Sequence, residues 1–168
     1  LVMTSTALAM RDHGFSTAAA ADVVRWHAVA MFAPSAFTGS VVARLGHRRV
    51  IVLGLVLLGA AAIIALSGVE LPYFYLALIA LGLGWNFGFI GATAMVADTY
   101  RPSEKGKTQG FHDLALFTTV AFSSFMSGRV FVTSGWETMN LVALPIALVC
   151  MAAIALEARR AGARLLPG

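Results

Sequence analysis

The chain has 168 residues, of which 59% are apolar and only 12% carry a charge, and its mean hydropathy is +0.82. Soluble domains carry charge at roughly a quarter of their positions, so this composition indicates a membrane protein, and the length predicts one domain. The formal charge of +4 does not indicate a nucleic-acid partner, because the twelve Lys and Arg are scattered between apolar runs and form no basic face.

Catalytic and metal-binding motifs are missing from the sequence. The lone Cys150 lies in an apolar run, which excludes a disulfide framework and the common cysteine zinc sites. The chain contains no HExxH, no Gly-x-Ser-x-Gly and no phosphate-binding Gly-rich lysine loop. We therefore predict that the protein is not an enzyme and holds neither a metal nor a cofactor.

The first predicted membrane segment is short. Residues 1–10 are apolar but would form only about 15 Å of helix, half the thickness of a bilayer. No basic segment precedes them, so they do not read as a signal peptide. We interpret them as the end of a truncated span and the chain as a fragment.

Five complete spans are predicted after this stub. The runs 50–69 and 71–97 hold twenty and twenty-seven residues without a charge, each long enough to cross a hydrocarbon core of about 30 Å. Trp136 falls near the end of another span, where an indole suits the headgroup region. All five predicted spans lie within one transmembrane domain covering residues 1–168: 18–43, 50–69, 71–97, 109–132 and 138–156.

Successive spans make the connecting segments alternate between the two sides of the membrane. Cytoplasmic loops accumulate Lys and Arg, so the side that holds more of them is predicted to be cytoplasmic, together with the carboxyl terminus. Three of the twelve fall on the other side: Arg11, Arg25 and Arg129. The remaining nine share the predicted cytoplasmic side of a multi-pass protein of the cell membrane: Arg44, Arg48, Arg49, Arg101, Lys105, Lys107, Arg159, Arg160 and Arg164.

The turn GSVVARLGHRR, residues 39–49, joins two of the predicted spans on this basic side. A tight reversal there needs a residue with positive φ, and Gly46 is predicted to supply it. The guanidinium of Arg44 can bind helix carbonyls or a carboxylate. An ordinary basic loop would account for the charges equally well.

This turn resembles the loop motif of the major facilitator superfamily, a glycine, three residues, Asp-Arg, one residue, Gly and two basic residues. Ala43 stands at the Asp position and His47 at the first basic position. The segments GLGWNFGFIGAT and YRPSEKGKTQGFHD also look like bacterial members. Four positions match the motif: Gly39, Arg44, Gly46 and Arg48.

The resemblance implies an all-α polytopic helical bundle that forms the carboxyl-terminal half of a transporter, with the end of span seven followed by spans eight to twelve. It also implies secondary active transport of a small solute by alternating access between two six-helix halves. The expected partners are the lipid bilayer, a small-molecule substrate and the missing amino-terminal half. The alternative is a membrane anchor or assembly subunit without transport activity.

Polar residues inside the spans are costly, and they are the functional candidates. Arg25 can instead pair with Asp22 three residues earlier or snorkel to the interface, and His27 can be a satisfied core histidine. Asp113 near the start of its span can simply favour the helix dipole. The candidates for the substrate pathway are Arg25, His27, Trp85 and Asn86, and those for proton or ion coupling are Asp22, His112 and Asp113.

Asn86 and Trp85 lie near the middle of the longest uncharged run. A buried carboxamide offers a donor and an acceptor to a ligand, but it can equally bond a neighbouring helix. Gly84 and Gly88 are predicted to permit close helix packing on another face, about 200° around the helix from Asn86. We therefore favour a cavity position for Asn86 over a role in interhelical packing.

Overall fold

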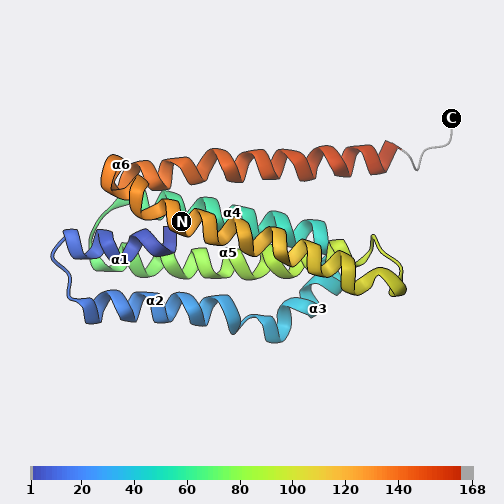
Figure 1. The fold of residues 1–168 in the computed structure, drawn as a ribbon, viewed down its shortest axis with the longest axis horizontal. Coiled ribbons are helices and arrows are strands. Elements are labelled where there is room, and N and C mark those ends of the chain that lie inside the picture. Colours follow the sequence, from blue (N-terminus) through green and yellow to red (C-terminus); the bar gives the residue numbers. More distant parts are fainter. Residues whose placement is uncertain (1, 164–168) are drawn as a thin grey trace.

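The computed structural model describes residues 2–163, and within this range the chain forms helices joined by short turns, with no β-strand (Figure 1). The prediction of an all-α bundle is confirmed. The helices lie side by side along the long axis of the molecule. In chain order they are α1 Val2–Asp12, α2 Thr17–Phe32, α3 Ser35–Leu45, α4 His47–Ser67, α5 Leu71–Ala97, the 3-10 helix η1 Pro102–Glu104 and α6 Lys105–Ala163.

The segment predicted as one span over 18–43 is two helices, α2 and α3, bent by 43°. The Ser16 hydroxyl caps the start of α2 by accepting a hydrogen bond from the Ala19 N–H at 3.2 Å. The break falls at Ala33 and Pro34, because proline has no N–H to continue the helical ladder. The sequence analysis missed this break although Pro34 was its visible signal.

Helix α6 contains both of the last two predicted spans. Its backbone leaves helical geometry at Gly135, where φ is 75° and ψ is 178°. The chain reverses there, so residues 105–134 and 136–163 form two antiparallel stretches, named here the first arm and the second arm (Figure 1). The first arm begins four residues before the predicted start of its span, at Lys105 instead of 109.

Several described helices have the length and composition needed to cross a membrane. Helices α4 and α5 do so, as does the stretch Pro102–Glu157 that covers most of α6, and α2 with α3 can form one further broken span. Helix α5 occupies the whole charge-free run 71–97. The chain is therefore a multi-pass membrane protein whose environment is the lipid bilayer.

Helix α5 packs against α4 on one side and α2 on the other, and glycines allow both approaches. A Cβ added at Gly54 of α4 would lie 2.6 Å from the backbone nitrogen of Gly88 and 2.8 Å from the Gly84 carbonyl oxygen. A Cβ at Gly82 would lie 2.6 Å from the His27 carbonyl oxygen of α2. The close packing predicted at Gly84 and Gly88 is therefore present, with Gly54 as its partner.

Aromatic side chains fill the end of the bundle where α6 reverses. The Trp136 indole N–H donates to the Ala65 carbonyl oxygen at 3.0 Å, and its ring lies 5.6 Å from that of Phe74. Only 7% of Trp136 is exposed. Trp136 lies beside the reversal, near a helix end as predicted, and its N–H finds a partner inside the bundle.

The basic segments gather at the opposite end of the bundle. The turn between α3 and α4, the turn between α5 and α6, and the end of the second arm all lie there (Figure 1). Arg164 lies outside the described residues. The alternation of the connecting segments is thus the one that the sequence predicted, while the side of the membrane remains a prediction.

The turn between α3 and α4 generates the first test. Gly46 has φ 83° and ψ 150°, which confirms its predicted positive φ, and this region is almost closed to residues with a Cβ. Gly46→Val should lower the free energy of unfolding by about 1 to 3 kcal/mol, measured by thermal unfolding of the intact protein in detergent. Gly39→Val is the control, because Gly39 is helical and has open space around it. Equal stability of the two variants would contradict the argument.

The packing of α2 on α5 generates a second test. Gly82→Ala should destabilise the protein by about 1 to 3 kcal/mol, the usual cost of overpacking, because the new methyl group meets the α2 backbone. Gly59→Ala in α4 is the matched control, since a Cβ there meets nothing within 4 Å and alanine favours a helix. If both variants unfold at the wild-type temperature, the contact between the two helices is looser than described.

Candidate functional site

A groove of about 660 Å³ runs between α5 and the first arm of α6. It begins at Trp85, near the middle of α5, and extends to the turn at the basic end of the bundle. The side chains are mostly apolar, with three threonine hydroxyls and one imidazole among them. Helix α5 and the turn after it contribute Trp85, Val96 and Thr99, and the first arm contributes Thr108, Phe111, His112, Ala115, Leu116, Thr119 and Val120.

An aromatic pair lies at the midspan end of this groove. The rings of Trp85 and Phe89 are nearly parallel, 5° apart, with their centroids separated by 6.2 Å. The two residues are one helical turn apart and both are half-buried. Of the two, Trp85 lines the groove, and its stacking on Phe89 helps to hold the orientation of its ring. Trp85 was a predicted pathway residue, and the sequence analysis missed Phe89.

His112 brings a polar group to the groove from the first arm. Its Nδ1 lies 3.1 Å from Oδ1 of Asp113, which also accepts a hydrogen bond from Gln109 Nε2 at 3.2 Å. The helix-dipole explanation of Asp113 is wrong, because α6 begins at Lys105 and the dipole acts within the first turn. Across the described residues, no three His, Cys, Asp or Glu side chains are grouped as metal ligands.

Two threonines of the groove have a defined hydrogen-bond polarity. The Thr99 hydroxyl donates to the Val96 carbonyl oxygen at 2.7 Å, and the Thr119 hydroxyl donates to the Ala115 carbonyl oxygen at 2.8 Å. Each hydroxyl proton is therefore used within the chain. The oxygen lone pairs remain to accept hydrogen bonds from a ligand.

A charged cluster lies away from the groove, near the starts of α2 and α5. Asp22 accepts hydrogen bonds from the Arg25 guanidinium and from the Tyr75 hydroxyl. The predicted pairing of Asp22 with Arg25 is confirmed. The Arg25 side chain is 72% exposed, and Tyr75 was missed because it lies fifty-three positions away in the sequence.

His27 has a packing role in the structure. Only 4% of the residue is exposed, and its Nδ1 donates to the Leu78 carbonyl oxygen of α5 at 2.8 Å. This bond joins α2 to α5 just before the close approach at Gly82. The arrangement matches the satisfied core histidine that was the alternative to a pathway role.

Asn86 also bonds neighbouring helices. It is 2% exposed, and its Nδ2 lies 2.7 Å from both the Met31 carbonyl oxygen and Ser35 Oγ. Its Oδ1 accepts from the Thr38 hydroxyl at 2.6 Å. The favoured cavity position is therefore wrong, because partners from α2 and α3 fill the carboxamide's donor and acceptor positions within this bundle.

The loop motif holds the basic ends of three helices together. His47 Nδ1 lies 3.3 Å from Oδ2 of Asp98, after the end of α5. Arg48 Nη2 donates to Oε1 of Glu157 on the second arm at 2.7 Å. Both pairs involve residues at the basic end of the motif, whereas its Asp position is occupied by Ala43. Arg44 and Gly39 are exposed.

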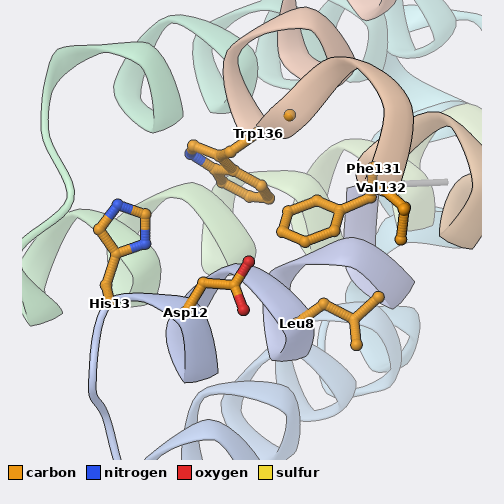
Figure 2. A pocket seen from close by; sticks show the side chains of 7 residues that line it. Leu8, Asp12, His13, Phe131, Val132 and Trp136 are labelled. Atoms are coloured by element: carbon orange, nitrogen blue, oxygen red, sulfur yellow. The ribbon is translucent and has the colours of Figure 1, made fainter.

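A second pocket, of about 410 Å³, lies where α1 meets the reversal of α6. Figure 2 shows Asp12 and His13 at the end of α1, facing Trp136 and Phe131 across it. The His13 ring is held by a hydrogen bond from Nδ1 to the Ala9 carbonyl oxygen at 2.7 Å. None of the sequence-predicted candidates lines this pocket.

The candidates thus divide among four places. Trp85 and His112 share the groove, with Asp113 beside His112. Asp22 and Arg25 belong to the charged cluster. His27 and Asn86 pack α2 and α3 on α5, and the loop motif joins the basic ends of the helices. The groove is the one place where predicted pathway and coupling residues meet around a cavity.

Comparison with known proteins identifies relatives over almost the whole chain. The family model described as Major Facilitator Superfamily matches residues 1–167. The riboflavin transporter RfnT of Brucella anthropi is 49% identical over 162 residues, which are 96% of this chain and 41% of that protein. The uncharacterized MFS-type transporter YddS of Bacillus subtilis is 32% identical over 161 residues, 95% of this chain and 37% of that protein.

A further transporter of Bacillus subtilis, the uncharacterized MFS-type YdeG, is 36% identical over 143 residues, 84% of this chain and 33% of that protein. The chain therefore spans about two fifths or less of the length of these relatives. No solved structure matches it significantly. Because the family match extends over 1–167 and the helical bundle agrees with it, the chain belongs to the major facilitator superfamily.

Proposed function

We propose that this chain is the carboxyl-terminal half of a secondary active transporter that carries a planar aromatic solute of the riboflavin class by alternating access. The observation that carries the proposal is the Trp85 ring, which lines the midspan end of the groove and stacks on Phe89. The similarity to a protein named as a riboflavin transporter supports the choice of solute. Two six-helix halves around a midplane site are the usual arrangement for this mechanism.

The chemistry of the groove suits such a solute. Its volume of about 660 Å³ is in the range of small-molecule sites, roughly 300 to 1,000 Å³. A flat heteroaromatic ring can stack on Trp85, an interaction of about 0.5 to 1.5 kcal/mol beyond the burial of apolar area. The hydroxyl oxygens of Thr99 and Thr119 can accept hydrogen bonds from the solute's hydroxyl and ring N–H groups.

The two arms of α6 differ in polarity, and this difference indicates which arm faces the solute pathway and which faces the lipid. The first arm carries polar side chains along its length, including Gln109, His112 and Asp113, whereas residues 138–156 of the second arm have no charge. Polar groups facing lipid are expensive, so the first arm is assigned to the solute pathway and the second arm to the bilayer. An amino-terminal half would then close the open side of the groove.

Coupling to a proton or another ion is assigned to carboxylates inside the spans. Asp22 is half-buried and bonds both Arg25 and Tyr75, so a change in its charge would change the contact of α2 with α5. Asp113 beside His112 is the second coupling candidate, next to the groove. Intramembrane carboxylates are common elements of such pathways.

The proposed orientation, with the basic end and the carboxyl terminus in the cytoplasm of a cell-membrane protein, has a direct test. In a Cys150→Ala background, Ser103→Cys and Val69→Cys introduce exposed labelling sites on opposite ends of the bundle. In whole cells an impermeant maleimide should label the cysteine at 69, and the one at 103 should react only after lysis. Labelling of both positions in whole cells would contradict the topology.

The proposed solute site is tested through Trp85. Trp85→Ala in the intact protein should weaken riboflavin binding about fivefold to tenfold, the equivalent of about 1 to 1.4 kcal/mol, because the stacking surface is lost. Trp85→Phe should retain most of the affinity. Binding is measured by the quenching of flavin fluorescence.

Trp26→Ala is the control for this experiment, because Trp26 is exposed on α2 and lines neither cavity. A loss of riboflavin affinity in Trp26→Ala but not in Trp85→Ala would refute the groove as the solute site. No riboflavin binding by the wild type would refute the solute class. Riboflavin binding without uptake in cells would favour the non-transporting alternative.

A further inference from the structure

The break between α2 and α3 leaves backbone groups without their helical partners. Pro34 has no N–H to donate to the Ala30 carbonyl oxygen. Among the described residues no backbone bond joins the Ser35 N–H to the Met31 carbonyl oxygen, as a continuous helix would. Orphan groups at such a break must find other partners, because lipid supplies none.

Asn86 of α5 bonds one of these backbone groups, the Met31 carbonyl oxygen, and two hydroxyl side chains after the break. Its Nδ2 lies 2.7 Å from the Met31 carbonyl oxygen before the break and 2.7 Å from Ser35 Oγ after it. Its Oδ1 accepts at 2.6 Å from the Thr38 hydroxyl, whose oxygen also lies 2.8 Å from the Pro34 carbonyl oxygen. One carboxamide therefore bonds both helices that meet at the bend.

The surrounding packing holds α2 by more buried contacts than α3, which contacts α5 and α4 but buries one residue. Helix α2 is held on α5 by the His27 bond to Leu78 and by the close approach at Gly82. In α3 the fully buried residue is Thr38, which is the one bonded to Asn86. Movement of α3 against α2 must therefore change the contacts of Asn86.

We propose that Asn86 is a positioning residue for alternating access, which sets the bend between α2 and α3 and transmits it from α5. Helix α3 leads directly into the basic turn at Gly46, so a change in the bend moves this end of the bundle. The carboxamide is suited to the task because it donates and accepts without carrying a charge into the membrane. The link to alternating access rests on the proposed transport function, but the control of the bend does not.

The experiment measures the bend directly in the intact protein. Nitroxide labels at Ala21→Cys on α2 and Arg44→Cys on α3, both exposed sites in a Cys150→Ala background, report the distance between the helices by double electron–electron resonance. Asn86→Leu should broaden the distance distribution, because Met31 and Thr38 lose their shared partner. Transport of riboflavin should fall roughly tenfold, the effect of losing one or two hydrogen bonds in a rate-limiting rearrangement.

A second substitution tests the cause. Pro34→Ala restores a backbone N–H at the break, so the double variant Pro34→Ala with Asn86→Leu should return to a narrow distribution at a longer distance, as for a straighter helix. Its transport should stay slow, because a continuous helix through residue 34 no longer lets α3 move against α2. Thr38→Val removes one of the three hydrogen-bond partners of Asn86, so it should broaden the distribution less than Asn86→Leu does. This variant replaces Asn86→Leu in the experiment if the latter does not fold.

Asn140→Leu is the matched control. Asn140 is an equally buried carboxamide, but its Nδ2 bonds the Trp136 carbonyl oxygen within its own helix at 2.9 Å. Its loss should leave the distance distribution between α2 and α3 unchanged, because none of its hydrogen bonds reaches either helix. Broadening of the same size in Asn140→Leu would show a general loosening and overturn the proposal.

Two other results would overturn the proposal. Asn86→Leu with an unchanged distribution and a lower unfolding temperature would make Asn86 a static packing residue. An unchanged distribution with weaker riboflavin binding would make it a solute contact. Because the distances are measured without solute, failure of riboflavin as the substrate leaves this test of the bend intact.

Discussion

The close approach of α5 to its two neighbours is the constraint on which the rest of this half depends. Gly54 and Gly84 let the α4 and α5 backbones meet, and Gly82 does the same for α5 and α2. In lipid there is little hydrophobic force between helices, so such backbone proximity provides much of the attraction. With both sides of α5 occupied in this way, Trp85 faces neither neighbour's backbone and is left at the loosely packed seam with α6.

Buried polar side chains then form hydrogen bonds between helices, which lipid could not replace. His27 bonds the Leu78 carbonyl oxygen, Trp136 bonds the Ala65 carbonyl oxygen, and Asn86 bonds both sides of the break at Pro34. Each bond joins helices that are distant in sequence. Because an unpaired polar group buried in lipid costs several kcal/mol, these contacts specify which helices are neighbours as well as stabilising the bundle.

The polar residues that pack the helices together are thus not the polar residues that line the groove. His27 and Asn86 near the glycine contacts are buried and hydrogen-bonded, whereas the groove beside α6 keeps threonine oxygens and the His112 ring at a cavity wall. The basic end is tied by the pairs His47–Asp98 and Arg48–Glu157. The residues that pack the bundle and those that line the groove are thus different sets.

Hydropathy, charge and positive φ act locally along the chain, so the class of protein, the alternation of the connecting segments and the glycine turn at Gly46 could be predicted from the sequence. The pairing of Asp22 with Arg25, which lie one turn apart, could be predicted in the same way. The bonds of Asn86 to α2 and α3, the bond of Tyr75 to Asp22, and the groove shared by Trp85 and His112 became visible only in the folded bundle. Those relations depend on how far and at what angle helices approach, and a carboxamide or an indole reads the same in sequence whether it faces a neighbour or a cavity.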